Sequence, residues 1–405
     1  MKDLNYPWIS RQETLRRILE RSQFQPRVEM IPVSEALDRI TARDELSKNT
    51  LPNAPTSMLD GIALKSSNLD GGIPKTDHWQ LGKDYIFSNT GVGIPEEFDT
   101  VVLIEDVNVN EKGKLSISCI PEKGKNIRPV GDMMKTGDVL VPAYVHLRSA
   151  HLGLLTAGGI DKVAVLEKPK VAILPTGNEL VPAGTQPPRG KNVEYNGMMI
   201  KAQVESMGAE AKLYPITRDN PEDLIKVIEN ALAWADIVIL NGGSSKGSDD
   251  RAIEVLESVG EVLVYEVAYG PGKHTTMTIA GHKPIVGTVG PTIGAEYAVD
   301  WYVAPLINKY LHQPTVKPRQ LKVKLLKEIK APMPFDFYAR MEVKPIEGGF
   351  AAKQIGKSAP LVQQMMADAV LHIPGKVKAY AAGEMIEVEL KCPIEWIERK
   401  VSHEF

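Results

Sequence analysis

The feature that most constrains the fold is a regular alternation of strand-like and helix-like segments between residues 169 and 312. Short apolar runs such as Val171–Leu174 and Ile237–Leu240 have the composition of strands buried on both faces. Between them lie segments with helical spacing, and Pro221–Ala235 begins with the proline typical of a first helical turn. Strands and helices that alternate in this way predict a parallel sheet covered on both faces, a doubly wound α/β domain.

The rest of the chain is predicted to form three further parts. Residues 49–137 begin with a Pro-, Asn- and Ser-rich segment and contain short strand-like runs, which indicates an inserted β-rich domain. Residues 1–48 and 138–168 flank it as a connector. In this connector we expect one helix that begins after Ser10, a second that begins at Val33 and a third that ends at Gly158-Gly159. A Pro-rich linker precedes alternating strands in residues 316–405, which predict a C-terminal β-barrel or sandwich. We therefore expect a multidomain α/β plus β fold, with the α/β domain at residues 169–312.

Composition excludes several classes of protein. A chain of 405 residues with 43% hydrophobic and 24% charged residues is expected to bury several cores. The net charge of −3 gives no basic field for nucleic acid, and no apolar run is long enough to cross a membrane. Two cysteines are too few for a disulfide framework or a thiolate metal site. These observations predict a soluble cytoplasmic protein without nucleic-acid or membrane partners.

Two loops of the α/β region carry the polar groups of a ligand site. In an open α/β sheet, ligands bind beyond the carboxyl ends of the strands. The first loop follows residue 174 and contains Thr176, Gly177 and Glu179. The second, residues 241–250, offers three glycines, three hydroxyls, one ammonium and two carboxylates, a set that can cradle an oxyanion beside a cation. From the residues alone, a flexible turn with a capping aspartate is an equally open interpretation.

Other motifs are weaker. Gly243–Gly247 matches G-x-S-x-G and would make Ser245 a hydrolase nucleophile, but the residues around it lack the sharp strand-to-helix turn that such a serine needs. Gly356-Lys357-Ser358 resembles the end of a phosphate-binding loop, without that motif's first glycine. The turn at Gly270–His274 can present Lys273 to a phosphate or serve as an ordinary hairpin turn. No His or Cys set has zinc-ligand spacing.

Taken together, these motifs resemble the MoeA family, the molybdopterin molybdenumtransferases that include the gephyrin E domain. The resemblance runs almost end to end, and its motifs occur in the family's order. The matching segments are Ser57–Ala63 (S-A-M-D-G-Y-A), Asn89-Thr90-Gly91 before Pro95, Ile127-Arg128 with Gly131 and Gly137-Asp138, Val171–Leu180 (V-A-I-x-x-T-G-D-E-L), Gly242–Asp250 (G-G-V-S-V-G-x-x-D), Pro271-Gly272-Lys273 (K-P-G-K-P) and Gly356-Lys357-Ser358.

The resemblance implies a fold, a reaction and a set of site residues. It implies an elongated four-domain subunit in a homodimer, with the molybdopterin-binding α/β domain of one subunit facing the β-rich domain of the other. It implies Mg²⁺-dependent hydrolysis of adenylated molybdopterin with insertion of molybdate, and partners that adenylate molybdopterin or accept the finished cofactor. It assigns Asp60, Glu179 and Asp250 to catalysis and to Mg²⁺, and Thr90, Thr176, Gly177, Asp219, Gly242, Gly243, Ser245, Lys273, Arg340 and Ser358 to substrate binding. For Asp219, an N-cap before Pro221 is the structural alternative.

Four departures from the family pattern define a second hypothesis. Met133 stands where the family has an acid, Glu266 and Gly270 stand at two basic positions, and residues 289–294 lack the family's prolines and serine at their places. Loss of positive charge weakens binding of a polyanion. The alternative is therefore a non-catalytic molybdopterin-binding or scaffold paralogue.

Overall fold

The chain forms two compact units. The computed structural model describes residues 7–111, 113–242 and 252–400. The main unit comprises Met1–Arg27 and Glu167–Phe405, and the insert unit comprises Val28–Leu166. The first 27 residues thus group with the α/β domain, whereas the predicted connector contained them. The four-part division of the chain stays a prediction.

The N-terminal segment belongs to the main unit because it pairs and packs there. Helix α1 (Arg11–Arg21) begins after Ser10, whose side chain accepts a hydrogen bond from the backbone N–H of Glu13, as the sequence predicts. Ile9 forms a bridge with Val267, and α1 packs against the edge strands of the sheet. Ile18 and Thr14 are the buried residues of this helix.

The centre of the main unit is a mixed sheet of six strands. In order across the sheet these are β15 (Glu210–Leu213), β12 (Lys170–Pro175), β16 (Ile237–Asn241), β20 (Lys283–Thr288), β19 (Thr276–Ala280) and β17 (Glu261–Val264). The first four are parallel, which confirms the predicted parallel sheet, and the last two are antiparallel. The doubly wound arrangement follows from crossovers that run in opposite directions from β12 and from β15.

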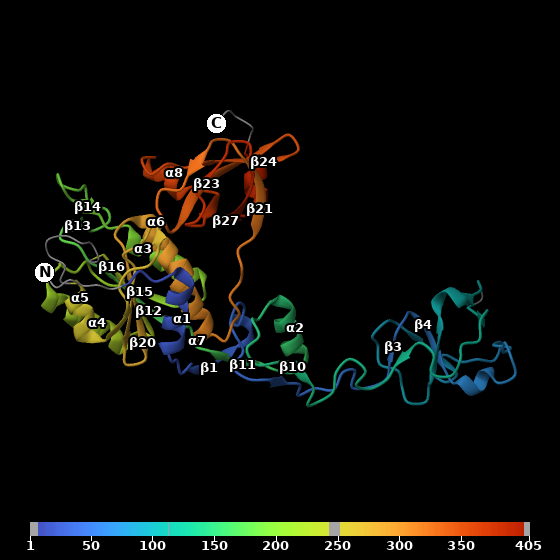
Figure 1. Cartoon of the computed structure of the whole chain (residues 1–405). Coiled ribbons are helices and arrows are strands. Elements are labelled where there is room, and N and C mark those ends of the chain that lie inside the picture. The colour runs from blue at the N-terminus through green and yellow to red at the C-terminus, as the bar shows by residue number, and fades with distance from the viewer. Residues whose placement is uncertain (1–6, 112, 243–251, 401–405) are drawn as a thin grey trace. The chain divides into compact units, whose positions relative to one another are not determined.

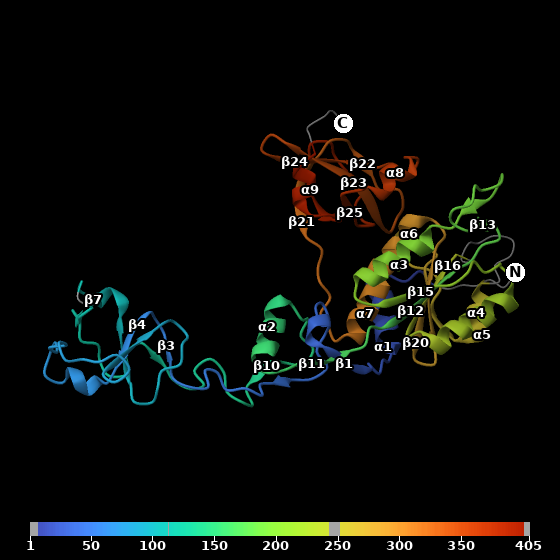
Figure 2. The same cartoon turned by 180° about the vertical axis from the view of Figure 1, so that it is seen from behind.

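Helices cover both faces of this sheet. On one face α4 (Pro221–Trp234) and α5 (Ala252–Val259) lie side by side (Figures 1 and 2) and share a core with alternate residues of β12, β16 and β20. On the other, α3 (Asn196–Ser206) packs against β12 and α6 (Thr292–Ala298). Residues 292–310 form three helical segments, because a π-helical turn at Val299–Val303 separates α6 from α7 (Ala304–Tyr310).

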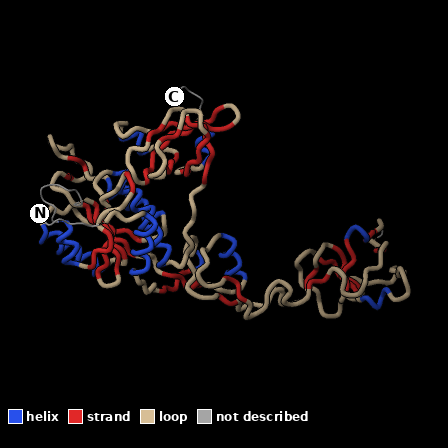
Figure 3. Tube along the Cα trace, in the orientation of Figure 1, coloured by secondary structure: helices blue, strands red, loops and turns tan. Residues whose placement is uncertain are grey.

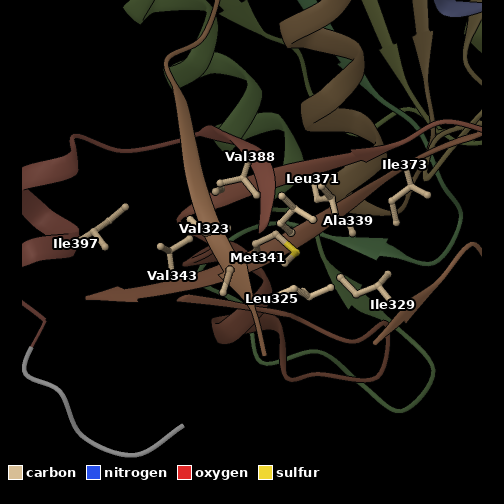
Figure 4. Close-up of a cluster of buried hydrophobic side chains, with 13 residues drawn as sticks. Val323, Leu325, Ile329, Ala339, Met341, Val343, Leu371, Ile373, Val388 and Ile397 are labelled. Atoms are coloured by element: carbon tan, nitrogen blue, oxygen red, sulfur yellow. The ribbon is translucent and has the colours of Figure 1, made fainter. Parts of the chain in front are cut away.

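The C-terminal region is a closed barrel, in agreement with the predicted barrel-like domain. Its strands run in the order β23 (Asp336–Ile346), β24 (Gly349–Gln354), β21 (Gln320–Leu325), β27 (Met385–Leu390) and β25 (Ala369–Ile373), and β25 pairs again with β23. Alternate residues such as Val323, Leu325, Met341 and Val388 fill the interior (Figure 4). A short strand of the α/β domain, β18 (Tyr269–Gly270), adds to the edge of β23. Short helices α8 (Leu361–Met365) and α9 (Ile394–Glu398) and the pair β22 (Ile329–Lys330) and β26 (Ala379–Tyr380) complete this region.

The insert unit consists mainly of short strands joined by long loops (Figure 3). Strands β1 (Val28–Pro32) and β11 (Lys162–Leu166) pair antiparallel at its base, with β2 (Glu45–Leu46), β10 (Val139–Val141) and α2 (Ser149–Ala157) beside them. Further along, β4 (Gly61–Leu64) lies between β5 (Tyr85–Ser88) and β6 (Thr100–Leu103) in a three-stranded sheet. Two separate strand pairs accompany this sheet: β3 (Thr56–Ser57) pairs with β9 (Ile127–Arg128), and β7 (Val107–Val109) pairs with β8 (Leu115–Ile117). The helix predicted from Val33 is wrong: the chain forms one 3-10 turn at Val33–Glu35, and a helix cannot continue past Asp38, whose φ is +61°.

Candidate functional site

The loops that follow three parallel strands begin at one edge of the sheet. Pro175 pairs with Asn241, and Asn241 pairs with Thr288, so β12, β16 and β20 end in register. The backbone N–H of Thr176 donates to Asn241 O at 2.9 Å, and that of Gly242 donates to Thr288 O at 3.1 Å. The structure therefore brings the first predicted loop and the start of the second together at the edge where ligands of α/β sheets bind.

The first loop is organised around the carboxylate of Asp219. Thr176 Oγ1 donates to Asp219 Oδ1 at 2.7 Å, and the Asn178 N–H donates to Asp219 Oδ2 at 3.1 Å. Asp219 is not the N-cap of α4, because the side chain of Asn220 accepts the hydrogen bonds from the first helical turn. The structural alternative for Asp219 is therefore wrong, and Asp219 instead links the loops after β12 and β15.

Glu179 lies in the same loop, with an exposed carboxylate. A Cβ added at Gly177 would lie 2.7 Å from Glu179 Oε2, so the carboxylate occupies the space that a side chain at residue 177 would take. The absence of a side chain at Gly177 thus lets the carboxylate of Glu179 fold back over the loop.

The start of the second loop is held by an amide that the sequence interpretation did not single out. Asn241 is 3% exposed, and its Nδ2 donates to Thr288 Oγ1 at 2.9 Å and to Val289 O at 3.1 Å. Gly242 follows with φ +111°. Three predicted residues of this loop, Gly243, Ser245 and Asp250, lie outside the described residues.

A second missed group lies at the first turn of α3. Asn196 Nδ2 donates to Gly290 O at 2.7 Å, and Glu194 Oε1 accepts from the N–H of Gly197 at 2.6 Å. Thr292 Oγ1 donates to Tyr195 OH at 2.8 Å. These contacts join the start of α3 to the loop after β20. A local signal exists in the polar residues 194–196, but Gly290 and Thr292, which Asn196 and Tyr195 contact, lie about a hundred positions further along the chain.

Lys273 has an exposed side chain on a fixed turn. The Thr275 N–H and Oγ1 donate to Gly272 O at 3.0 and 2.7 Å. A Cβ at Gly272 would lie 2.9 Å from the Tyr269 ring and 3.4 Å from Gly294 Cα, so the turn packs closely against the first turn of α6. This places the backbone of the lysine turn beside the segment that follows β20.

Arg340 is engaged inside the protein. Its side chain is 3% exposed and forms an ion pair with Glu296, while its guanidinium also donates to Gln364 O. Burial lowers the pKa of Arg340 to about 10, which leaves the group charged at neutral pH. Glu296 also pairs with Lys391. This network links α6 to the barrel and accounts for the buried charge of Arg340 without a ligand; a substrate contact stays a prediction.

Ser358 lies in an exposed turn before α8. The structure places it on the barrel, after β24, and its predicted role stays untested.

In the insert unit the structure brings two predicted residues together. The backbone N–H and the Oγ1 of Thr90 both donate to Asp60 Oδ1, at 2.7 and 3.0 Å. Asp60 follows a turn in which Met58 and Leu59 are exposed, and Ile104 N–H donates to Asp60 O at 3.0 Å. The carboxylate of Asp60 therefore fixes the turn that carries Thr90 and leaves its second oxygen for other contacts.

A cavity of about 380 Å³ lies elsewhere, between α1 and the barrel. Arg11, Phe335 and Lys376 are among the residues that line it, and none of the predicted site residues does. In the described part of the chain, no group of three His, Cys, Asp or Glu side chains is placed to hold a metal ion. No helix among these residues is long and apolar enough to cross a membrane.

Comparisons with known proteins agree with this architecture. The MoeA N-terminal region (domain I and II) matches residues 9–159, and the probable molybdopterin binding domain matches residues 172–309. The chain is similar to the molybdopterin molybdenumtransferase of Haemophilus influenzae, with 30% identity over 82% of each protein. It is 28% identical to the Staphylococcus epidermidis protein of the same name over 94% of this chain and 95% of that one. The crystal structure of the molybdopterin biosynthesis MoeA protein from Pyrococcus horikoshii has a TM-score of 0.79 at 27% identity, covering 95% of this chain and 99% of that one.

The fold and the site define a MoeA-like multidomain protein whose α/β domain is of the molybdopterin-binding type. The chain belongs to the molybdopterin molybdenumtransferase family.

Proposed function

We propose that this protein is a molybdopterin molybdenumtransferase that acts in molybdenum cofactor biosynthesis. The observation that carries this proposal is the convergence of the loops after β12, β16 and β20 at one edge of a domain of the probable molybdopterin binding type. Backbone N–H groups and hydroxyls at such an edge suit the oxygens of a phosphorylated pterin. The named relatives support the transfer of molybdenum as the reaction.

The finer proposal is that the substrate is adenylated molybdopterin, that its adenylate is hydrolysed with Mg²⁺, and that molybdate is inserted. In it, Thr176, Gly177 and Asp219 shape the pterin loop, and Lys273 offers its ammonium to a phosphate. Breaking a phosphoanhydride develops negative charge on oxygen, which fixed donors and cations stabilise.

The described residues do not by themselves form a Mg²⁺ cage. Carboxylate oxygens suit this ion, but no three acidic, His or Cys side chains gather among the described residues, and Asp250 lies outside them. Chelation of divalent ions in the activity assay tests the requirement for Mg²⁺.

We also propose that the chain forms a homodimer. Its proposed protein partners are an enzyme that adenylates molybdopterin and the molybdoenzymes that accept the finished cofactor. The light-scattering mass of the purified chain tests the dimer: twice the mass of one chain supports it, and the mass of a single chain contradicts it.

The alternative, a non-catalytic paralogue, gains no support from two of the departures that suggested it. The carboxylate of Glu266 contacts Trp8 and His274 rather than standing as a free anion. Gly270 lies in the strand β18 that pairs with β23, and a Cβ there would lie 2.5 Å from Met333 Sδ. The contacts of Glu266 and the close approach of Met333 to Gly270 thus explain why these residue types stand at positions 266 and 270.

One experiment tests the enzyme. The purified chain is incubated with adenylated molybdopterin, Mg²⁺ and molybdate, and release of AMP and formation of cofactor are followed, with and without a chelator. We expect both products, and their loss in Asp250→Ala, while Glu229→Ala, which removes an exposed carboxylate from the middle of α4, leaves them unchanged. Binding of the substrate without release of AMP would contradict the enzyme, and full release by Asp250→Ala would contradict the site.

A further inference from the structure

The turn that presents Lys273 is held on both sides of that residue. On one side, the Val267 N–H donates to Lys273 O at 2.8 Å. On the other, His274 Nδ1 lies 2.9 Å from Glu266 Oε1. The pair of residues 266–267 is thus joined to the pair 273–274 by one backbone and one side-chain contact. Because Lys273 itself is exposed, these contacts fix its backbone and leave its ammonium at the surface.

Glu266 is the buried centre of this arrangement. It is 4% exposed, and Trp8 Nε1 donates to Glu266 Oε2 at 2.6 Å. The Ile9 N–H donates to Glu266 O at 3.2 Å, and the Ala268 N–H donates to Ile9 O at 2.7 Å, so Ile9 forms an isolated parallel bridge with Val267. The Trp8 ring packs edge-on against Phe335 of the barrel, with ring centroids 4.7 Å apart. A buried carboxylate needs such partners, since burial without them is costly.

These contacts change the meaning of an acid at position 266. A free carboxylate beside a phosphate site repels the ligand. The carboxylate of Glu266 is instead directed into the protein, where it accepts a hydrogen bond from Trp8 and lies 2.9 Å from His274 Nδ1. Glu266 then affects ligand binding through the turn of Lys273, which it holds in place.

We propose that Glu266 and His274 are positioning residues that fix Lys273 for binding the phosphate of the pterin substrate. The inference rests on the proposed function, because it takes Lys273 as a phosphate contact. Two possible roles of Glu266 predict opposite changes in substrate affinity when its charge is removed. If Glu266 positions Lys273, removing its charge weakens substrate binding; if it repels the substrate, removing its charge strengthens binding.

The test measures the Kd of the full chain for adenylated molybdopterin by calorimetry. Lys273→Gln is expected to raise Kd about 10- to 100-fold, as for loss of one charge-assisted hydrogen bond. Glu266→Gln and His274→Gln are each expected to raise it about fivefold or more. Glu261→Gln removes the same charge at the start of β17, where Glu261 pairs with Arg21 at the surface, and is expected to leave Kd unchanged.

A double-mutant cycle separates positioning from a general structural effect. In the Lys273→Gln background, Glu266→Gln is expected to have no further effect on Kd, because the group it positions is gone. A lower Kd in Glu266→Gln, or an equal rise of Kd with and without Lys273, would overturn the inference. An unchanged Kd in Lys273→Gln alone would instead contradict the proposed phosphate contact. Thermal melts of each variant show whether it is folded, and His274→Gln carries the test if Glu266→Gln does not fold.

Discussion

Gly242 joins the two site loops through its backbone. Its φ of +111° lies in the region that favours glycine, and a Cβ there would lie 2.3 Å from the carbonyl oxygen of Thr176. Thr176 is in turn bonded to Asp219, so a shift at residue 242 would move both loops. The geometry of this edge therefore depends on a residue without a side chain.

We expect Gly242→Ala to destabilise the fold by about 2–5 kcal/mol, the sum of left-handed strain and overpacking against Thr176. Gly281→Ala is the matched control: Gly281 has φ +63° in the hairpin between β19 and β20, and nothing lies within 4 Å of an added Cβ. It is expected to cost only about 1–2 kcal/mol. Urea unfolding of both variants measures the difference, and equal losses would contradict the close approach of Gly242 to Thr176.

At the scale of elements, an aromatic cluster joins the short strand β18, the interrupted helix and the barrel. The Tyr269 ring lies edge-on to Trp301, with centroids 5.0 Å apart, and Trp301 lies 4.3 Å from the Tyr338 ring. Tyr297 stacks on Trp301 at 4.7 Å. The cluster thus combines residues of β18, α6, the π-helical turn and β23, and with the Arg340–Glu296 ion pair it fixes the barrel against α6.

This cluster predicts a loss of stability at alkaline pH. Burial raises the pKa of Tyr269, Tyr297 and Tyr302 well above the ordinary value, and it raises that of Tyr338 to about 12. Below about pH 10 these phenols are protonated whether or not the chain is folded, so their contribution to stability is intact. As the pH rises from about 10 to about 12, the unfolded chain releases protons that the folded chain retains, and the free energy of unfolding falls.

The measurement is absorbance near 295 nm with rising pH, combined with urea unfolding at about pH 8 and about pH 11. We expect a fraction of the 12 tyrosines to ionise only when the chain unfolds, and a lower free energy of unfolding at the higher pH. Ionisation of all tyrosines near pH 10 in the folded chain would contradict the buried cluster.

Local patterns predicted those elements whose signals are local. Ser10 marks the start of α1, Pro221 lies in the first turn of α4, and the apolar run at β16 is fully buried, as expected from their residues. The π-helical turn at Val299–Val303 was not predictable, because the apolar spacing on both sides of it is helical.

In the site, too, features with a local sequence signal were predictable and contacts between distant residues were not. The loops after β12 and β16 were predictable from strands followed by Gly and polar residues, whereas the bond of Trp8 with Glu266 joins residues 258 positions apart. Likewise, the buried pairing of Arg340 with Glu296 is set by how the barrel meets α6, and no spacing in the sequence indicates it.

At the scale of the whole molecule, the insert unit begins and ends at adjacent points. Val28 and Leu166 are partners in the pair β1 and β11, and just outside them the Glu167 N–H donates to Arg27 O at 2.8 Å. The insert unit also has hydrophobic clusters built from its own residues, one around Leu147 and Val163 and another around Ile62 and Val102. A segment with paired ends and its own cores has what an independently folding unit needs.

We therefore expect residues 28–166 to fold alone, and the main unit to fold when a short Gly-Ser linker joins Arg27 to Glu167 in their place. Trp79 is the one tryptophan between residues 28 and 166, and it packs near Tyr85, so its fluorescence reports unfolding of the isolated insert unit. Each piece is expected to show one cooperative transition in urea, and the linked main unit is expected to keep the Tyr269 and Tyr338 cluster, seen as tyrosines that resist ionisation. A gradual, non-cooperative change in either piece would mean that the two units stabilise each other, and would place the folding unit at the whole chain rather than at its parts.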